Sequence, residues 1–192
     1  MAPQEAPEVK VLVHPHSSIL YPRDLPLESL RIPVRERRFS AAAVGNAAAQ
    51  RILCSMAARA RIYRNEVRSV SRTPGALLVY LHPPELTFSH QNTIETMGVP
   101  EHTAKKIIAY GSRLQMNLIA FARSRLGDRL VETRVMPFFL GNAFSYSLAR
   151  KISVKSRISV LGERRNVCVD LAAKSLIRSG FKNVAVIEEK SA

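Results

Sequence analysis

Arginine is the residue type that offers the most chemistry in this sequence. The 192 residues include 29 lysines and arginines against 15 aspartates and glutamates, a formal net charge of +14 at pH 7. Of these cations, 21 are arginine and only 8 are lysine. The planar guanidinium group donates hydrogen bonds in a fork that fits phosphate, and it stacks on nucleobases. The composition therefore predicts that polyanions are attracted to this protein.

The positive charge is concentrated in segments that have the patterns of folded elements. Residues 35–72 carry +7, residues 103–134 carry +5 and residues 135–182 carry +7. Residues 1–34 and 73–102 carry −1 and −3. This distribution differs from a basic tail of the nuclear-localisation type and predicts a charged face on a folded body. The alternative is that the arginines are solvated helix faces with no specific partner.

The sequence lacks the patterns of catalytic and metal sites. His14 and His16 lie in a proline-rich stretch and His82 precedes two prolines, so no HExxH zinc motif is present. There is also no GxSxG nucleophile motif, no P-loop and no GxGxxG dinucleotide motif. No pair of carboxylates is placed for acid–base chemistry. We therefore expect no enzymatic activity, no cofactor and no metal.

The two cysteines and the apolar runs indicate where the protein resides. Cys54 and Cys168 lie far apart, each within a helix-like pattern, which predicts buried reduced thiols rather than a disulfide. No apolar run reaches the ~18–20 residues of a membrane span. The N-terminus has no signal-peptide pattern. We expect an intracellular reducing compartment, either the cytoplasm or the mitochondrial matrix.

The elements that must position the arginines begin after an N-terminal segment. Residues 1–34 hold six of the eleven prolines and show no helical period, so we expect an extended arm that binds a neighbouring protein. Within it, the run 11–13 predicts an edge strand. Three further elements follow it: a strand at 37–44, a helix at 47–63 and a strand at 76–81.

Within the predicted helix 47–63, the apolar and basic side chains separate by position. Ile52, Met56 and Tyr63 fall on one stripe, which we expect to be core. Arg51, Ser55 and Arg59 repeat every four residues on another face. Arg59, Arg61 and Arg64 gather toward the C-terminal end, where the helix dipole favours cations.

The second half of the chain continues the alternation of strands and helices. A clear 3.6-residue apolar period predicts a long helix from residue 100 to 126, ended by Gly127. The elements expected after it are strands at 130–140, 152–161 and 183–187 and helices at 143–151 and 167–179. The alternation predicts an α/β or α+β fold.

Three strand-like runs end in an apolar residue and glycine that lead into a helix, at 41–52, 138–148 and 158–169. The backbone amides that follow such a turn point outward at the positive N-terminal end of the helix, where an anion can bind. Gly45 and Asn46 form the first turn. Arginines accompany two of the turns, namely Arg37 and Arg38 before the first and Arg164 and Arg165 beside the third. The alternative is that the turns serve packing alone.

The run VGNAAAQRILCSMAARARI and the following VYLHP resemble the nucleic-acid-binding Alba fold, and most closely the stage V sporulation protein S family. The matching positions are Gly45, Asn46, Gln50, Ala58 and Arg59. Residues 157–187 look like the opening strand–helix–strand of an Alba domain, so the two pieces are either tandem degenerate modules or parts of one rearranged module. The resemblance implies an Alba-like sandwich, RNA or DNA binding and frequent dimerisation. With it, we expect an Alba-like unit at 35–99, and a helix plus a second such unit at 100–192.

Two functions follow as hypotheses. The first is a non-catalytic RNA-binding subunit of a ribonucleoprotein assembly such as an organellar ribosome, with RNA favoured over DNA. The expected phosphate contacts are Arg37, Arg38, Arg51, Arg59, Arg61, Arg64, Arg164 and Arg165, with Gly45 and Asn46 at the first turn. The second is a structural subunit of a protein-only complex, whose arginines pair with acidic partners.

Overall fold

The structure is a computed structural model that describes residues 7–13, 47–82, 95, 99–134, 148, 152–162 and 169–187. In chain order the elements are β1 (Glu8–Val13), α2 (Ala47–Arg72), β2 (Leu77–His82), α4 (Glu101–Leu126), the 3-10 turn η5 (Gly127–Arg129), β3 (Leu130–Arg134), β4 (Arg157–Gly162), α6 (Asp170–Arg178) and β5 (Asn183–Val186). This alternation of helices and strands confirms the α/β prediction.

The chain divides into two compact units. The first unit contains the five strands, α6 and the ends of the two long helices α2 and α4. The second contains the earlier parts of the same two helices, up to Arg64 and Phe121. Each unit has a hydrophobic core of its own.

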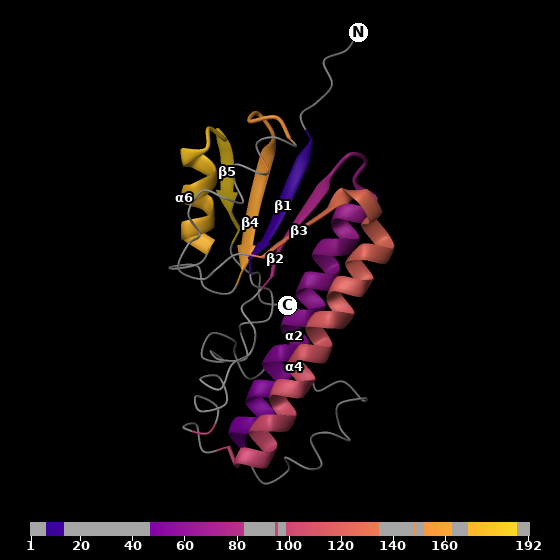
Figure 1. Ribbon diagram of the computed structural model, residues 1–192, viewed down its shortest axis with the longest axis vertical. Helices are drawn as coiled ribbons and strands as arrows, with labels where there is room; N and C mark the ends of the chain where they lie inside the picture. Colours follow the sequence, from indigo (N-terminus) through magenta and orange to yellow (C-terminus); the bar gives the residue numbers. More distant parts are fainter. Residues whose placement is uncertain are drawn as a thin grey trace. The chain divides into compact units, whose positions relative to one another are not determined.

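The five strands of the first unit form one sheet in the order β3-β2-β1-β4-β5 (Figure 1), and every neighbouring pair is parallel. From β1 the chain winds through α2 and α4 to β2 and β3 on one side. It then returns to β4 and continues through α6 to β5 on the other side. The sheet is therefore doubly wound, and the direction of winding reverses between β1 and β4.

Strand β1 corrects the prediction of an edge strand in an extended arm. It lies in the centre of the sheet and pairs with β2 and β4. A central parallel strand is covered on both faces, and Val9, Val11, Leu12 and Val13 are accordingly 0–1% exposed. Lys10 interrupts the apolar run that would have identified such a strand. Residues 8–13 therefore belong to the folded sheet, together with strands from the segments 35–99 and 100–192.

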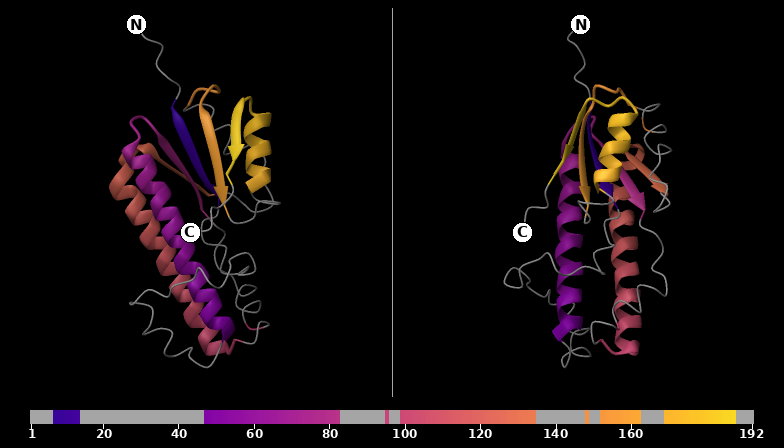
Figure 2. Two further views of the ribbon diagram at one scale, coloured as in Figure 1. Left: turned by 180° about the vertical axis from the view of Figure 1, so that it is seen from behind. Right: turned by 90° about the vertical axis from the view of Figure 1, so that its left-hand side faces the viewer.

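Alternate side chains of β1 point to opposite helical layers. The amino group of Lys10 donates a hydrogen bond to Glu66 of α2. Val9 and Val11 instead belong to a hydrophobic cluster that includes Ala172 and Leu176 of α6. The end of α2 and helix α6 thus cover opposite faces of the sheet (Figure 2). Parallel sheets are normally protected in this way on both sides.

In the second unit, the core forms between the two helices. Ile52 and Met56 of α2 are 0% and 2% exposed, and they belong to one cluster with Ala104 and Ile107 of α4. The apolar stripe predicted for residues 100–126 faces this core at Ile107. A helix pair of this kind is stabilised mainly by burial of its apolar stripes.

Several predicted element boundaries are confirmed, and two are wrong: the end of the helix predicted at 47–63 and the start of the strand predicted at 152–161. The predicted helix 100–126 is α4, and α2 continues past Tyr63 to Arg72. The strand predicted at 152–161 begins only at Arg157, because the amide of Ser156 donates to the carbonyl of Ser153 and closes a turn. The predicted strand 37–44 lies outside the described residues.

Candidate functional site

The predicted phosphate contacts divide into four groups. Arg61 and Arg64 lie on α2 with exposed side chains. Arg51 is also in α2, but its side chain is outside the described part of the structure. Arg59 is buried. The remaining predicted contacts lie outside the described residues: Arg37, Arg38, Gly45, Asn46, Arg164 and Arg165.

The burial of Arg59 corrects the predicted basic face. Ser55 and Arg59 are 1% and 2% exposed, so they do not form an exposed stripe on α2. Arg59 lies three residues after Met56 and four before Tyr63, and both of these belong to the buried side of the helix. At 3.6 residues per turn these spacings place Arg59 on the same side. We therefore remove it from the surface available to phosphate.

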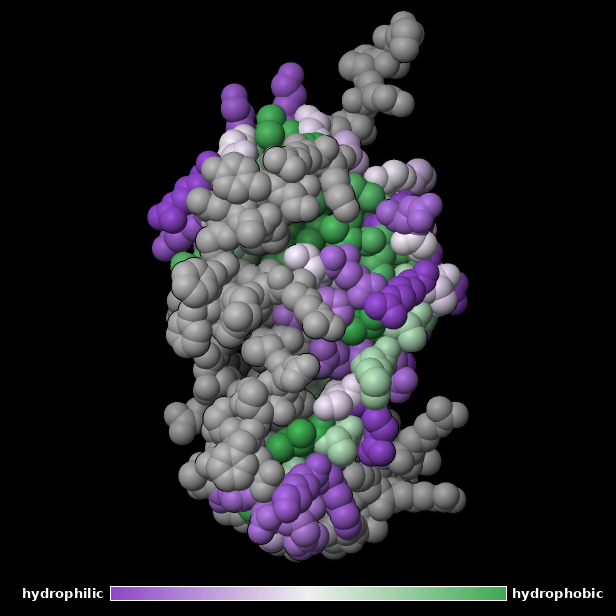
Figure 3. Space-filling view, in the orientation of Figure 1, coloured by the Kyte–Doolittle hydropathy of each residue, from purple (hydrophilic) through white to green (hydrophobic). Residues whose placement is uncertain are grey.

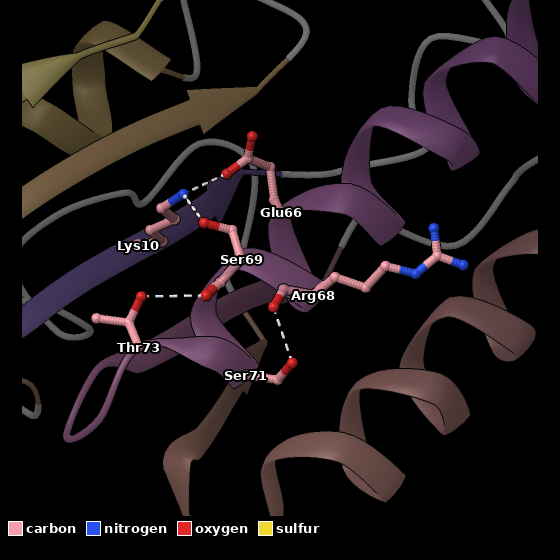
Figure 4. Close-up of polar contacts among 6 residues, drawn as sticks. All are labelled: Lys10, Glu66, Arg68, Ser69, Ser71 and Thr73. Atoms are coloured by element: carbon pink, nitrogen blue, oxygen red, sulfur yellow. Dashed lines mark hydrogen bonds and ion pairs between the residues drawn. The ribbon is translucent and has the colours of Figure 1, made fainter.

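The exposed arginines of α2 form a different series. Arg61, Arg64, Arg68 and Arg72 are all exposed, and spacings of three, four and four residues keep them on one side of the helix. In Figure 4 the side chain of Arg68 extends away from Glu66. The guanidinium group of Arg68 donates a hydrogen bond to the side-chain oxygen of Asn65 at 3.0 Å. Hydrophilic residues, in purple in Figure 3, also lie over α6.

Glu66 is the only acidic residue of α2, and it is already bound. Its carboxylate accepts a hydrogen bond of 2.5 Å from Lys10, whose amino group also lies 3.2 Å from the hydroxyl of Ser69 (Figure 4). The Lys10 and Glu66 side chains are 13% and 24% exposed. Because this carboxylate neutralises the lysine of β1, it does not neutralise the arginines of its own helix.

Arg64 makes a contact that connects the two helices of the second unit. Its guanidinium carbon lies 5.8 Å from the centre of the Phe121 ring of α4, within the range of a cation–π interaction. Phe121 is half-buried, although its position on the apolar stripe predicts a core residue. Sequence reasoning missed this pair because the two residues are brought together only by helix packing. Tyr63 and Tyr80 are both 0% exposed and belong to the core, as expected for Tyr63.

A second cluster of charged groups lies where β2 and β3 pair. Arg123 donates from Nε and Nη2 to the two carboxylate oxygens of Glu132, at 2.6 and 2.8 Å. Nε2 of His82 lies 2.9 Å from the same carboxylate, and the His82 ring packs edge-on against Tyr80. The hydrogen bond from Arg123, together with that from His82, holds the pKa of Glu132 below its ordinary value against the opposing effect of burial.

The chemistry of this cluster follows from that ionised carboxylate. Glu132 is a hydrogen-bond acceptor for two cationic or polar groups, and it fixes the orientation of the His82 imidazole. The contacts link β2, β3 and α4 of the first unit. No motif in the sequence predicts this cluster, because its members are separated by 9 to 50 residues.

Strands β1 and β4 end side by side at the point where the winding reverses. Open parallel sheets bind ligands beside the carboxyl ends of such a strand pair. There the backbone approach is close: a Cβ atom on Gly162 would lie 2.6 Å from the carbonyl oxygen of Val13 and 2.8 Å from Val169 Cγ2. The predicted Arg164 and Arg165 follow Gly162 in the sequence, outside the described residues.

Further observations bear on the functional class. In the described ranges, no group of three or more His, Cys, Asp or Glu side chains could hold a metal ion. None of the helices in these ranges has an apolar stretch long enough to cross a membrane. No protein-family model, curated protein or solved structure matches the chain. The resemblance to the Alba and stage V sporulation protein S families therefore stays a prediction.

Proposed function

We propose that this protein is a non-catalytic RNA-binding subunit of a ribonucleoprotein assembly, such as an organellar ribosome. The observation that carries this proposal is the series of exposed arginines along α2, namely Arg61, Arg64, Arg68 and Arg72. The helix has six arginines and one acidic residue, and that residue is bound to Lys10 of β1. Its exposed arginines thus offer guanidinium groups to an external anion.

The repeated spacing of the arginines favours an extended polyanion over a single small anion. Phosphates of a nucleic acid backbone recur along the chain, so they suit cations that repeat along a helix. The preference for RNA rests on the arginine bias and on the absence from the sequence of zinc-finger or basic-zipper spacing. Arginine guanidinium groups can also stack on unpaired bases.

A structural subunit of a protein-only complex is the second candidate, favoured by exposed apolar side chains on α6. Leu171 and Ile177 are 44% and 56% exposed. Apolar side chains at a surface are typical of contacts between subunits. A protein of this kind would bind an acidic partner chain, and its affinity for RNA would be that of any basic protein.

The proposal is tested with two double variants, one on α2 and one on α6, each of which replaces two basic residues by glutamate. The double variant Arg61→Glu and Arg64→Glu changes α2, and Lys174→Glu with Arg178→Glu changes exposed cations of α6. Both variants lower the net charge equally, which separates a local contact from general attraction. We expect the α2 variant to lose RNA affinity on the order of 10- to 100-fold and the α6 variant to lose much less. Equal losses would contradict a binding surface on α2.

Charge reversal also tests the predicted phosphate contacts that lie outside the described residues. Arg37→Glu with Arg38→Glu is expected to lower the RNA affinity if the strand–glycine turn binds phosphate. Unchanged binding would remove these two arginines from the site and leave the proposal to the arginines of α2.

A further inference from the structure

The contact between Arg64 and Phe121 places a cation and an aromatic ring together on the second unit. The guanidinium carbon is 5.8 Å from the ring centre. Arg64 is exposed and Phe121 is only half-buried, so part of this pair is accessible from solvent. Guanidinium planes and aromatic rings are the two kinds of side chain on which unpaired nucleobases stack.

The residues around this pair have the charge that a nucleic acid requires. Residues 47–64 of α2 and 102–121 of α4 contain no aspartate or glutamate. On α4, Arg113 and Asn117 precede Phe121 by eight and four residues, which places them on its side of the helix, and both are exposed. Neither Arg61 nor Arg113 forms an ion pair with any residue that the structure describes.

We infer that the Arg64–Phe121 pair is a stacking platform for a base of single-stranded RNA. The inference rests on the proposed function and names the form of RNA that the site takes. A base in a duplex is covered on both faces by its neighbours, so only an unpaired base can offer its face to this pair. The surrounding arginines supply the phosphate contacts, which are the same for single-stranded and duplex ligands.

Substitution of Phe121 separates stacking from phosphate binding. Phe121→Leu removes the ring and keeps an apolar side chain, whereas Phe121→Tyr keeps a ring of the same size. The probes are a short single-stranded RNA of mixed sequence, its duplex, and a strand of equal length in which every nucleotide lacks its base. The full-length chain is used throughout, and a thermal melt shows that each variant is folded.

We expect Phe121→Leu to weaken binding of the single strand by about 5- to 150-fold, the range for loss of one stacked base. Binding of the duplex and of the abasic strand should not change, since both lack an accessible base. The dependence of the affinity on salt should also stay the same, because no phosphate contact is removed. Phe121→Tyr should bind the single strand as the unsubstituted protein does.

Other outcomes overturn the inference. If Phe121→Leu binds the single strand normally while Arg61→Glu with Arg64→Glu does not, the platform is wrong and the proposed function stands. If Phe121→Leu weakens all three probes equally, the ring has only a packing role. If the unsubstituted protein binds no probe better than a control protein of equal charge, the proposed function fails as well.

A second measurement applies if Phe121→Leu does not fold. The sequence contains no tryptophan, so Phe121→Trp introduces a single indole at the platform. Stacking of a base on this ring should quench its fluorescence on addition of the single strand and not on addition of the abasic strand. Equal signals with both strands would overturn the inference.

Discussion

Replacing Arg129 with methionine removes the group that closes the carboxyl end of α2. One guanidinium nitrogen, Nη1, donates to the carbonyls of Thr73 at 3.0 Å and Val70 at 3.3 Å, and Nη2 donates to the carbonyl of Ser71 at 3.2 Å. The last carbonyls of a helix have no partner within it, and a cation there also interacts favourably with the helix dipole. Arg129 therefore donates to three carbonyls at once, of which those of Val70 and Thr73 also accept from the backbone amides of Thr73 and Ala76.

The size of the effect follows from these bonds. A hydrogen bond to a charged group contributes roughly 1.5–3 kcal/mol, and water replaces part of it when the carbonyls are near the surface. We expect Arg129→Met to lower the free energy of unfolding by about 1–3 kcal/mol, measured by urea denaturation monitored by circular dichroism. The free energy of unfolding of Arg129→Lys should lie between those of the unsubstituted protein and Arg129→Met, because an ammonium group keeps the charge but not the forked set of donors.

The matched control is Arg178→Met, at an exposed position in the last turn of α6. It should change the stability by less than about 0.5 kcal/mol. An equally small effect of Arg129→Met would refute the reasoning. RNA binding supplies a second check: since the Arg129 guanidinium is occupied by carbonyls, folded Arg129→Met should bind RNA as the unsubstituted protein does.

Three further perturbations act on other contacts of the first unit. Gly162→Ala should destabilise the fold by about 1–3 kcal/mol in urea denaturation, because its Cβ would lie 2.6 Å from the backbone oxygen of Val13. Glu132 has a lowered pKa, so its ionised form stabilises the native state above the ordinary glutamate pKa and this contribution is lost as pH falls through the lower value. The stability of the unsubstituted protein should therefore fall toward that of Glu132→Gln as the pH is lowered from the ordinary value of 4.5 through the lower native-state pKa of Glu132, and a constant difference would contradict this coupling. Lys10→Met leaves Glu66 partly buried without its partner, and adding Glu66→Leu should restore part of the lost stability; additive losses would show that the two groups are not coupled.

How much of the fold the sequence predicts depends on how each element is buried. Helix α4 carries a full apolar stripe over 26 residues, so its period identifies both its type and its ends. Strand β1 has a lysine in its middle and prolines after it, which hid its central place. The tertiary contacts with Glu66 and Ser69 explain how Lys10 is accommodated in the sheet.

The residues of the candidate site could also be predicted from the sequence only in part. The sequence predicts the arginines of α2 as a charged group, and the exposure of Arg61 and Arg64 agrees with that prediction. It does not predict that Arg59 is buried, because arginine at a core position is rare and a hydropathy pattern gives no sign of it. The pairing of Arg64 with Phe121 depends on the packing of two helices far apart in sequence, which no local spacing encodes.

RNA binding itself is tested most directly by a salt series with the purified protein and three ligands: single-stranded RNA, duplex RNA and duplex DNA. The account predicts that the logarithm of the binding constant falls linearly and steeply with the logarithm of salt concentration, by about 0.7 per phosphate contact for a single strand. It also predicts that single-stranded RNA binds most tightly. Equal binding of all three ligands, no tighter than to a control protein of net charge +14, would contradict RNA binding and favour the protein-only complex.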